Sequence, residues 1–178
     1  ASRQAGVRRF LFSSSACIYP EYRQNEAAVT ALKEDDAYPA MPEEGYGWEK
    51  LFTEKLCQYY QEDYEIETRV ARFHNVYGPL GTWDGGKEKA PAAISRKVAM
   101  ANDIDVIDIW GDGSQTRSFM YIDDCVEGVY RIMHSDYHLP LNLGTDELVT
   151  INELVDIVAG IAGKAITREH DLSKPQGV

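Results

Sequence analysis

Two side chains four residues apart could together take a proton from an alcohol. Tyr46 and Lys50 have the spacing that places both side chains on one face of a helix. A free phenol titrates near a pKa of ~10, too high for a base at neutral pH, but a neighbouring ammonium group favours the phenolate. The same spacing also occurs on helix faces that contact only water, so the pair alone is weak evidence for a site.

Ser15 strengthens the catalytic interpretation. It ends the run Ser13–Ser15, which follows an apolar segment and precedes Tyr46 by 31 residues. A serine hydroxyl beside the phenol could hold the substrate hydroxyl as its proton leaves. A hydride would then leave the same carbon, and a nicotinamide is the acceptor that this chemistry requires.

Cys17 and Lys89 could form a second pair for proton transfer. Cys17 lies two residues beyond Ser15, and a thiolate can remove a proton from carbon. By itself a free cysteine is more often a small buried residue, but the neighbouring serine, tyrosine and lysine favour the base. Lys89 ends a glycine-rich charged segment, residues 82–89, that is typical of a loop closing over a substrate. The alternative for Lys89 is a loop lysine that contacts only water.

The elements that must position these residues alternate between strand and helix. A buried strand is predicted over Val7–Ser13 and a helix over Tyr46–Asp63, while Ala1–Gly6 is predicted to be the end of a preceding helix. Such alternation is typical of an α/β fold with a parallel sheet. Further strands are predicted over Ile66–Phe73, Val106–Trp110, Arg117–Ile122, Leu141–Leu143 and Ala165–Glu169, and further helices over Ala90–Ala101, from a cap at Asp123 to about His134, and over Ile151–Ile161.

Composition excludes several classes of protein. The 178-residue chain has a formal net charge of −11 and a pI near 4.8, which argues against a nucleic-acid binder because such proteins usually present a basic face. No apolar run approaches the ~20 residues that span a membrane. The three cysteines have neither zinc-site spacing nor the density of a disulfide scaffold. We therefore expect no metal site and a reducing, cytoplasmic location.

Ser15, Tyr46 and Lys50 resemble the Ser-Tyr-Lys triad of the extended short-chain dehydrogenase/reductase family, whose members mostly act on nucleotide sugars. The resemblance covers essentially the whole chain. Three further segments resemble the strand ends and substrate loops of the family, in the expected order: RFHNVYGP (Arg72–Pro79), WGDGSQTRSFMYIDD (Trp110–Asp124) and LNLGTDE (Leu141–Glu147).

The resemblance implies an α/β fold made of the C-terminal part of a Rossmann-type parallel sheet and most of a smaller substrate-binding domain. Residues 1–75 would be the late part of the NAD-binding domain and residues 76–178 mainly the nucleotide-sugar domain, with the two interleaved. NAD would be the cofactor, contacted by Tyr46 and Lys50. A homodimer is also implied for the complete protein, and Tyr46–Asp63 is a candidate helix for its interface.

The residues after Ser15 indicate which of the family's reactions to expect. Family members that eliminate water from the sugar typically have Asp and Glu there, whereas this chain has Ala16 and Cys17. The segments SSACIYPE (Ser14–Glu21) and GTWDGGKEKAPAA (Gly81–Ala93) resemble the family members that epimerise GDP-mannose at C3 and C5. That resemblance implies GDP-L-galactose as the product, with GDP-L-gulose as the product inverted only at C5.

The same resemblance assigns roles to individual residues. Tyr46 would deprotonate the 4-hydroxyl, Ser15 would hold the oxygen, and Cys17 and Lys89 would exchange protons on opposite faces of the sugar. Residues Lys87–Lys97 carry a local charge of +3, from four cations and Glu88, which suits a diphosphate. The substrate site would be lined by Ser15, Ala16, Cys17, Asn75, Glu88, Lys89, Ala90, Lys97, Gln115, Thr116 and Arg117.

Two other functions stay open at this stage. One is a different NAD-dependent nucleotide-sugar epimerase or reductase of the same family, and the other is a non-catalytic nucleotide-binding protein. The glycine-rich dinucleotide fingerprint between a first strand and helix is not found in these 178 residues. We therefore expect an internal fragment that lacks most of the NAD site and, as an isolated chain, is inactive and poorly folded.

Overall fold

The computed structural model describes residues 1–24, 31–42 and 44–174. The chain divides into two compact units that interleave along the sequence. Of the described residues, the first contains 1–74 and 123–144, and the second contains 75–122 and 145–174. The active-site chemistry predicted above is thus divided between two units, each with its own sheets and helices.

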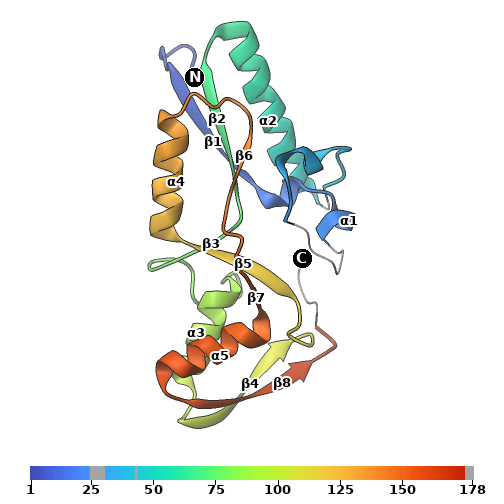
Figure 1. Cartoon of the computed structure of the whole chain (residues 1–178), viewed down its shortest axis with the longest axis vertical. Coiled ribbons are helices and arrows are strands. Elements are labelled where there is room, and N and C mark those ends of the chain that lie inside the picture. Colours follow the sequence, from blue (N-terminus) through green and yellow to red (C-terminus); the bar gives the residue numbers. More distant parts are fainter. Residues whose placement is uncertain (25–30, 43, 175–178) are drawn as a thin grey trace. The chain divides into compact units, whose positions relative to one another are not determined.

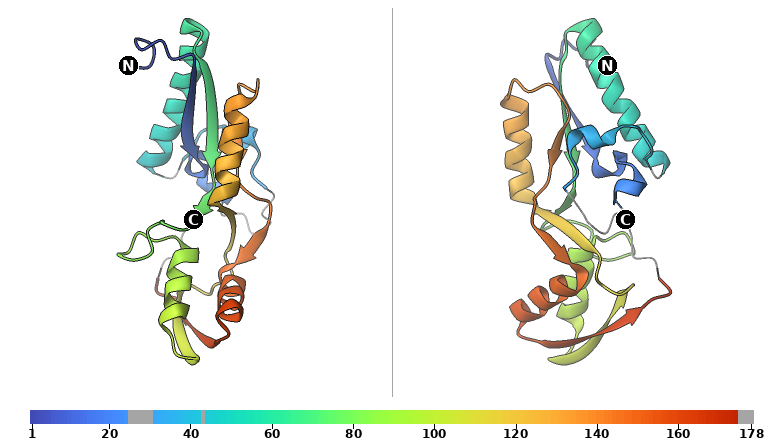
Figure 2. Two further views of the ribbon diagram at one scale, coloured as in Figure 1. Left: turned by 90° about the vertical axis from the view of Figure 1, so that its left-hand side faces the viewer. Right: turned by 45° about the vertical axis from the view of Figure 1, so that its right-hand side comes forward.

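A three-stranded parallel sheet forms the centre of the first unit, with β1 (Arg9–Ser15) beside β2 (Glu67–Phe73) and β2 beside β6 (Leu141–Leu143) (Figure 1). The register places Ser14 opposite Arg72 and Ser15 opposite Phe73. Helix α2 (Gly45–Tyr64) covers one face of this sheet and α4 (Ile122–His134) covers the other (Figure 2). The parallel α/β fold predicted from the sequence is confirmed.

Short elements connect β1 to α2. A 3-10 turn at Ala16–Ile18 follows β1 directly, and α1 (Glu21–Gln24) and a second 3-10 turn (Glu34–Ala37) come later in the segment. Ile18, Tyr19, Ala37 and Leu51 form a buried cluster. This cluster packs the segment after β1 against α2, so the residues that follow Ser15 are held beside the start of the helix.

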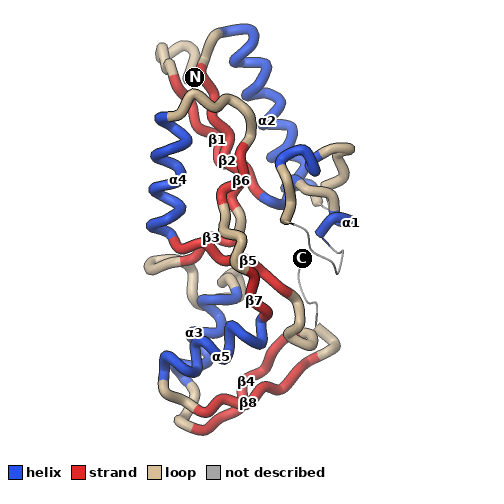
Figure 3. Tube along the Cα trace, in the orientation of Figure 1, coloured by secondary structure: helices blue, strands red, loops and turns tan. Residues whose placement is uncertain are grey.

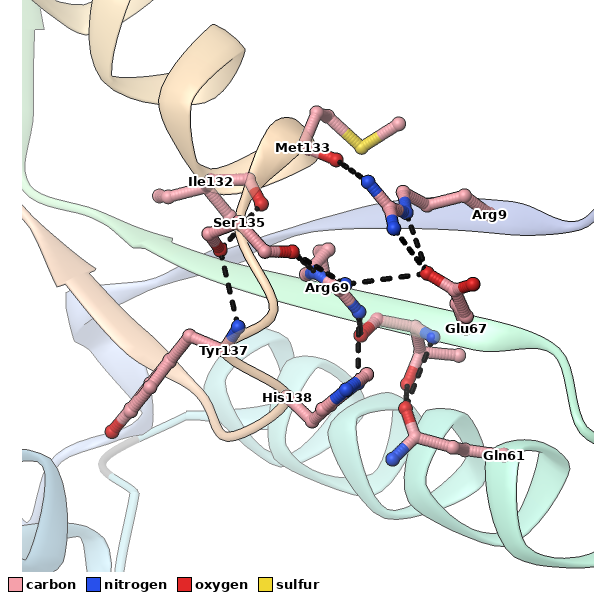
Figure 4. Close-up of polar contacts among 10 residues, drawn as sticks. Arg9, Gln61, Glu67, Arg69, Ile132, Met133, Ser135, Tyr137 and His138 are labelled. Carbon is pink, nitrogen blue, oxygen red and sulfur yellow. Dashed lines mark hydrogen bonds and ion pairs between the residues drawn. The ribbon is translucent and has the colours of Figure 1, made fainter.

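Arginine side chains tie the end of α4 to the sheet of the first unit. Arg69 on β2 is fully buried (0% exposed) and donates to the carbonyl oxygen of Ser135 through Nε at 3.1 Å and Nη2 at 2.6 Å. Arg9 on β1 donates to the carbonyl of Met133 and pairs with Glu67 (Figure 4). The last carbonyls of a helix have no partner within it, so these guanidinium groups satisfy them and fix α4 against β1 and β2.

The second unit contains two small sheets and two helices. β3 (Asn75–Tyr77) pairs in parallel with β5 (Thr116–Tyr121), which pairs antiparallel with β7 (Leu148–Thr150). β4 (Ile104–Trp110) and β8 (Ala165–Asp171) form a parallel pair and lie side by side in Figure 3. Helices α3 (Ala90–Met100) and α5 (Ile151–Ala162) pack their apolar faces together. The core of this unit consists of Ile94, Val98, Ile107, Ile109, Ile151, Leu154 and Val155.

Several predicted elements differ from the structure. The first strand begins two residues later than predicted, at Arg9, and is only partly buried, because among the described residues it is the edge strand of its sheet. Ala1–Gly6 forms turns instead of the end of a helix. Asp123 lies inside the first turn of α4, which begins at Ile122, and is not its cap. The short strands β3 and β7 were not predicted, whereas β6, which is equally short, was predicted with its observed bounds.

No helix in the described part of the chain has the length and apolar character to cross a membrane. Nor do the described residues contain a group of three or more His, Cys, Asp or Glu side chains arranged to hold a metal ion.

Candidate active site

The first part of the predicted site lies where β1 ends. Ser15 is the last residue of β1 and caps the 3-10 turn that follows, because its side-chain oxygen accepts a hydrogen bond from the amide of Cys17 at 3.2 Å. Cys17 is an exposed free thiol, while the next residue, Ile18, is fully buried. The serine cap and the buried isoleucine therefore hold the turn so that the thiol of Cys17 is open to solvent.

The second part lies on the first two turns of α2. Tyr46 is in the first turn with 52% of its surface exposed. The Nζ of Lys50 lies 5.4 Å from the centroid of the Tyr46 ring and donates to the carbonyl oxygen of Ser13 at 2.8 Å. The ammonium group is thus placed beside the phenol by a contact with β1, and the helical spacing predicted for the pair is confirmed.

A glycine allows these two parts to approach each other. A Cβ atom built on Gly47 would lie 2.2 Å from the carbonyl oxygen of Cys17 and 2.7 Å from the Cβ of Pro42. Real side chains do not come this close, so only glycine fits here. The first turn of α2 therefore packs directly on the backbone of Cys17. Gly47 was not predicted to belong to the site. The glycine next to Tyr46 in the sequence could have pointed to a close approach at this position.

A buried ion pair lies behind the exposed residues and was also not predicted. Glu54 on α2 and Arg72 on β2 are 5% and 2% exposed, and the guanidinium of Arg72 donates to both carboxylate oxygens at 3.1 and 2.8 Å. The hydroxyl of Ser14 donates to the same carboxylate. Glu54 lies four residues after Lys50, on the same helix face, which is the pattern that could have pointed to it.

The residues of the first unit have the donors that a nicotinamide cofactor needs. An ammonium group has three N–H donors, and one of those on Lys50 is used by Ser13. The others are available for ribose hydroxyls, beside the exposed phenol of Tyr46. Ser15 lies at the carboxyl end of a parallel strand, where open α/β folds bind their ligands, and Lys50 on α2 contacts the same strand end at Ser13.

The glycine-rich loop of the second unit is held by Arg96 of α3. The guanidinium of Arg96 donates to the carbonyl of Trp83 at 3.0 Å. It also forms ion pairs with Glu88 at 2.8 Å and with Asp84 at 3.7 Å. Glu88 also accepts a hydrogen bond from the amide of Gly86 at 2.7 Å. Hydrogen bonds from backbone amides, including that of Gly86, together with the Arg96 cation, lower the pKa of Glu88.

The cations predicted to bind a diphosphate are not equally available. Arg96 is paired as described, and Lys97 forms an ion pair with Asp108 at 2.9 Å and donates to its carbonyl. Lys89 is exposed at the start of α3. Within the described parts of the second unit, neither Lys87 nor Lys89 forms an ion pair. Of the predicted cations in this segment, Arg96 and Lys97 are thus the two that have carboxylate partners.

Five more predicted residues lie in the second unit. Asn75 begins β3 and donates to the carbonyl of Ser118 at 3.3 Å. Gln115 precedes β5, Thr116 begins that strand, and Ala90 is the first residue of α3. The guanidinium of Arg117 donates to the carbonyl of Thr116 at 2.7 Å, and burial lowers the pKa of Arg117. These five residues thus lie at or next to the starts of β3, β5 and α3.

Comparison with known proteins assigns the chain to a family. Residues 1–144 match the model of the NAD dependent epimerase/dehydratase family, and the chain belongs to that family. The resemblance inferred from the Ser-Tyr-Lys triad is therefore confirmed.

Within the family, one activity recurs among similar proteins. The whole chain is 51% identical to GDP-mannose 3,5-epimerase of Arabidopsis thaliana and 52% identical to GDP-mannose 3,5-epimerase 1 of Oryza sativa subsp. japonica, and covers 46% of each. A GDP-L-fucose synthase of Sinorhizobium fredii is 33% identical over 99% of the chain and 56% of its own length. The chain thus spans about half the length of the curated relatives it matches.

Solved structures show the same fold. A UDP-glucuronic acid 4-epimerase from Bacillus cereus, in complex with UDP-glucuronic acid and NAD, is 28% identical with a TM-score of 0.76, and the match covers 98% of this chain and 52% of that one. A UDP-N-acetylglucosamine 4-epimerase from Methanobrevibacter ruminantium, at 21% identity, has a TM-score of 0.84 over 99% of this chain and 54% of that one.

Proposed function

We propose that the intact protein epimerises GDP-mannose at C3 and C5 with NAD as a transiently reduced cofactor. The observation that carries this proposal is the exposed thiol of Cys17, placed beside Ser15 and packed through its backbone against Gly47, next to Tyr46. A carbon base is needed by an enzyme that inverts C3 and C5 and is not needed by a simple 4-epimerase. The similarity to proteins named GDP-mannose 3,5-epimerase supports the choice of substrate.

The first step concerns C4 of the sugar. Tyr46 takes the proton of the 4-hydroxyl while Ser15 donates a hydrogen bond to the same oxygen, which becomes that of a ketone. NAD, when bound, would supply the two-electron acceptor for the hydride of C4 and the donor for its return, so there would be no net oxidation. Lys50, beside the Tyr46 ring, supplies N–H donors for the cofactor ribose.

The second step exchanges protons on carbon. A ketone at C4 acidifies the hydrogens on C3 and C5, and removal of one gives an enolate. Cys17, as thiolate, removes the proton on one face, and Lys89, as ammonium, donates one to the opposite face, which inverts the carbon. Lys89 has no carboxylate partner among the described residues of its unit, so its proton is available for transfer.

Binding of the nucleotide sugar is assigned to both units. We assign NAD binding mainly to residues 1–75 and sugar-nucleotide binding mainly to residues 76–178. Arg117 can bind two phosphate oxygens at once, which lysine cannot. The proposed substrate contacts are Ser15, Ala16, Cys17, Asn75, Glu88, Lys89, Ala90, Lys97, Gln115, Thr116 and Arg117.

We also propose a homodimer in a reducing, cytoplasmic setting. Helix α2 exposes several large apolar side chains, including Trp48, Phe52 and Tyr59, and exposed apolar patches often mark interfaces between proteins. The three cysteines are free, as expected in a reducing compartment. Light scattering on the intact protein, with Phe52→Lys as the variant expected to give monomers, tests the dimer.

Isotope exchange tests the activity. The intact natural protein is incubated with GDP-mannose and NAD in heavy water, and deuterium in the sugar is located by NMR. Label at both C3 and C5 is expected. Turnover of a nucleotide sugar without carbon-bound deuterium would identify a 4-epimerase or reductase instead, and neither label nor turnover would favour a non-catalytic nucleotide-binding protein.

A cysteine variant assigns the base. Cys17→Ser should reduce deuterium exchange by about 100-fold or more, since a serine hydroxyl is a far weaker acid than a thiol and gives no useful concentration of base. Cys125→Ala, at a buried helical thiol in the same unit, is the matched control and should retain exchange. Equal exchange in Cys17→Ser and wild type would show that Cys17 is not the base.

A further inference from the structure

Three consecutive serines at the end of β1 each contact a different part of the candidate active site. The carbonyl of Ser13 accepts a hydrogen bond from Lys50, the hydroxyl of Ser14 donates to Glu54, and the side chain of Ser15 accepts from the amide of Cys17. Successive residues of a strand point to opposite faces, so the buried side chain of Ser14 points away from that of Ser15. The strand end thus contacts α2 at Lys50 and Glu54, and the turn after β1 at Cys17.

The contacts to α2 lie one helical turn apart. Lys50 and Glu54 are four residues apart and share one face of the helix. A single contact would let the helix rotate about that point or slide along the strand. Two contacts, to Ser13 and Ser14, fix both the rotation of α2 and its position along β1. Tyr46 lies one turn before Lys50, so its position is set by the same two contacts.

The buried ion pair extends this control to the turn that carries Cys17. Besides binding Glu54, Arg72 donates through Nη1 to the hydroxyl of Tyr19 at 3.0 Å and to the carbonyl of Glu34 at 2.7 Å. Tyr19 is fully buried, lies two residues after Cys17, and donates to Asn142 at 2.6 Å. Burial raises the pKa of Tyr19, so the hydroxyl keeps the proton that it donates.

We propose that Glu54, Arg72 and Ser14 form a positioning network that sets Tyr46 and Lys50 in register with Ser15 and Cys17. The network joins the residues of the hydride step, on α2, to the carbon base, on the turn after β1. It rests on the proposed function for the chemistry that it serves. None of its three members is proposed to touch the substrate, so they are positioning residues and not catalytic ones.

Each member of the network is hydrogen-bonded to another member, so the loss of one leaves a buried polar group without its partner. Both oxygens of the Glu54 carboxylate are bound by Arg72, and one of them also accepts from Ser14. Removing one partner of a buried ion pair leaves the other charge without compensation, so local rearrangement must follow. Because Gly47 already lies against the carbonyl of Cys17, any shift of α2 changes the relation between Tyr46 and Cys17.

The test compares Ser14→Ala and Glu54→Gln with Glu62→Gln in the intact natural protein. Ser14→Ala removes one hydrogen bond without leaving a buried charge, and remains useful if Glu54→Gln does not fold. Glu62→Gln changes an exposed carboxylate on the same helix, which contacts Gln58, and should behave as wild type. Thermal unfolding gives the temperature at which each variant begins to unfold, and kinetics are measured below that temperature.

We expect kcat in Ser14→Ala and Glu54→Gln to fall by about 10- to 100-fold, because a misplacement of ~1 Å costs about that much. KM should change by less than about threefold, and hydride transfer and C3/C5 exchange should fall together. A lower melting temperature with wild-type kcat in the folded variants would overturn the proposal and leave the network a purely structural role.

A measurement without substrate separates this inference from the proposed function. The alkylation rate of Cys17 by iodoacetamide should change severalfold in Ser14→Ala and Glu54→Gln, since the turn that sets the exposure of this thiol is no longer held against Gly47. If wild type shows no exchange with GDP-mannose, the proposed function fails, and the alkylation rate still decides whether the network positions Cys17. An unchanged rate in both folded variants would overturn the positioning role whatever the substrate.

Discussion

The ammonium group of Lys50 donates a hydrogen bond to the backbone carbonyl of Ser13 at 2.8 Å. Lys50 is therefore held by a main-chain atom and not by a carboxylate. The Nζ of Lys50 lies 5.4 Å from the centroid of the Tyr46 ring. The contact with Ser13 therefore fixes where the ammonium group sits relative to Tyr46, and leaves its other N–H donors for a ligand.

Replacing Lys50 by methionine should affect chemistry far more than folding. The variant keeps the length and apolar contacts of the side chain but loses the charge and the bond to Ser13. We expect hydride transfer to slow by about 100-fold or more and the melting temperature to change little, since Lys50 is only partly buried. Stopped-flow absorbance of the reduced nicotinamide and a thermal melt measure the two effects. Wild-type hydride transfer in this variant would contradict the role of Lys50.

Gly47→Ala should destabilise the protein by ~1–3 kcal/mol, the usual cost of forcing extra atoms into a packed site. The new methyl group would lie 2.2 Å from the carbonyl oxygen of Cys17, so α2 or the turn must move. Gly45→Ala is the matched control, because its Cβ meets nothing within 4 Å. It should change the free energy of unfolding by less than ~1 kcal/mol. Urea unfolding of the two variants distinguishes them, and equal stability would refute the close approach.

The three cysteines should differ in their reaction with iodoacetamide at pH 8. Cys17 is exposed, whereas burial, and next the Glu54 carboxylate, raise the pKa of Cys57 to about 11, and burial raises the pKa of Cys125. Since the thiolate is the reactive form, native protein should be labelled at Cys17 first. Cys57 and Cys125 should react only after unfolding in urea. Peptide mass spectrometry identifies the sites, and labelling of Cys57 at the rate of Cys17 would contradict the buried position.

Glu67 should make stability depend on pH in the acid range. The hydrogen bond from Arg9 lowers the pKa of Glu67 in the folded state, so the unfolded chain binds the proton more readily. The stabilisation from the Arg9 contact is therefore complete at a pH above ~4.3, the pKa of glutamate in an unfolded chain. It is lost as the pH falls through the lower pKa of Glu67 in the folded protein. Glu67→Gln should be less stable than wild type at pH 7, with the difference shrinking below pH ~4.

The control for that experiment is Glu49→Gln, at an exposed carboxylate of α2 that forms no ion pair among the described residues. Its difference from wild type should stay small at every pH. A constant difference between Glu67→Gln and wild type from pH 7 to pH 3 would show that the Arg9 contact does not shift the titration of Glu67.

Local patterns predicted most of the long elements correctly. The helix predicted over Tyr46–Asp63 is observed as Gly45–Tyr64, and the strand predicted over Ile66–Phe73 as Glu67–Phe73. Those elements have enough residues for their apolar spacing to show. The strand over Val7–Ser13 was predicted to be buried because it is apolar, but burial depends on what packs against a strand, and β1 has one strand neighbour among the described residues.

By itself the sequence determined that Tyr46 and Lys50 share a helix face, because that relation needs only the pitch of the helix. It also predicted the family, through Ser15, Tyr46 and Lys50 together with three longer segments, and the family model that matches residues 1–144 confirmed it. Only the tertiary structure showed that Glu54 binds Ser14 and Arg72, 40 and 18 residues away, and that Gly47 lies against Cys17. Such contacts join residues that are distant in sequence. They depend on which strands pair and where a helix packs against them. The local spacing of residue types does not reveal either of these.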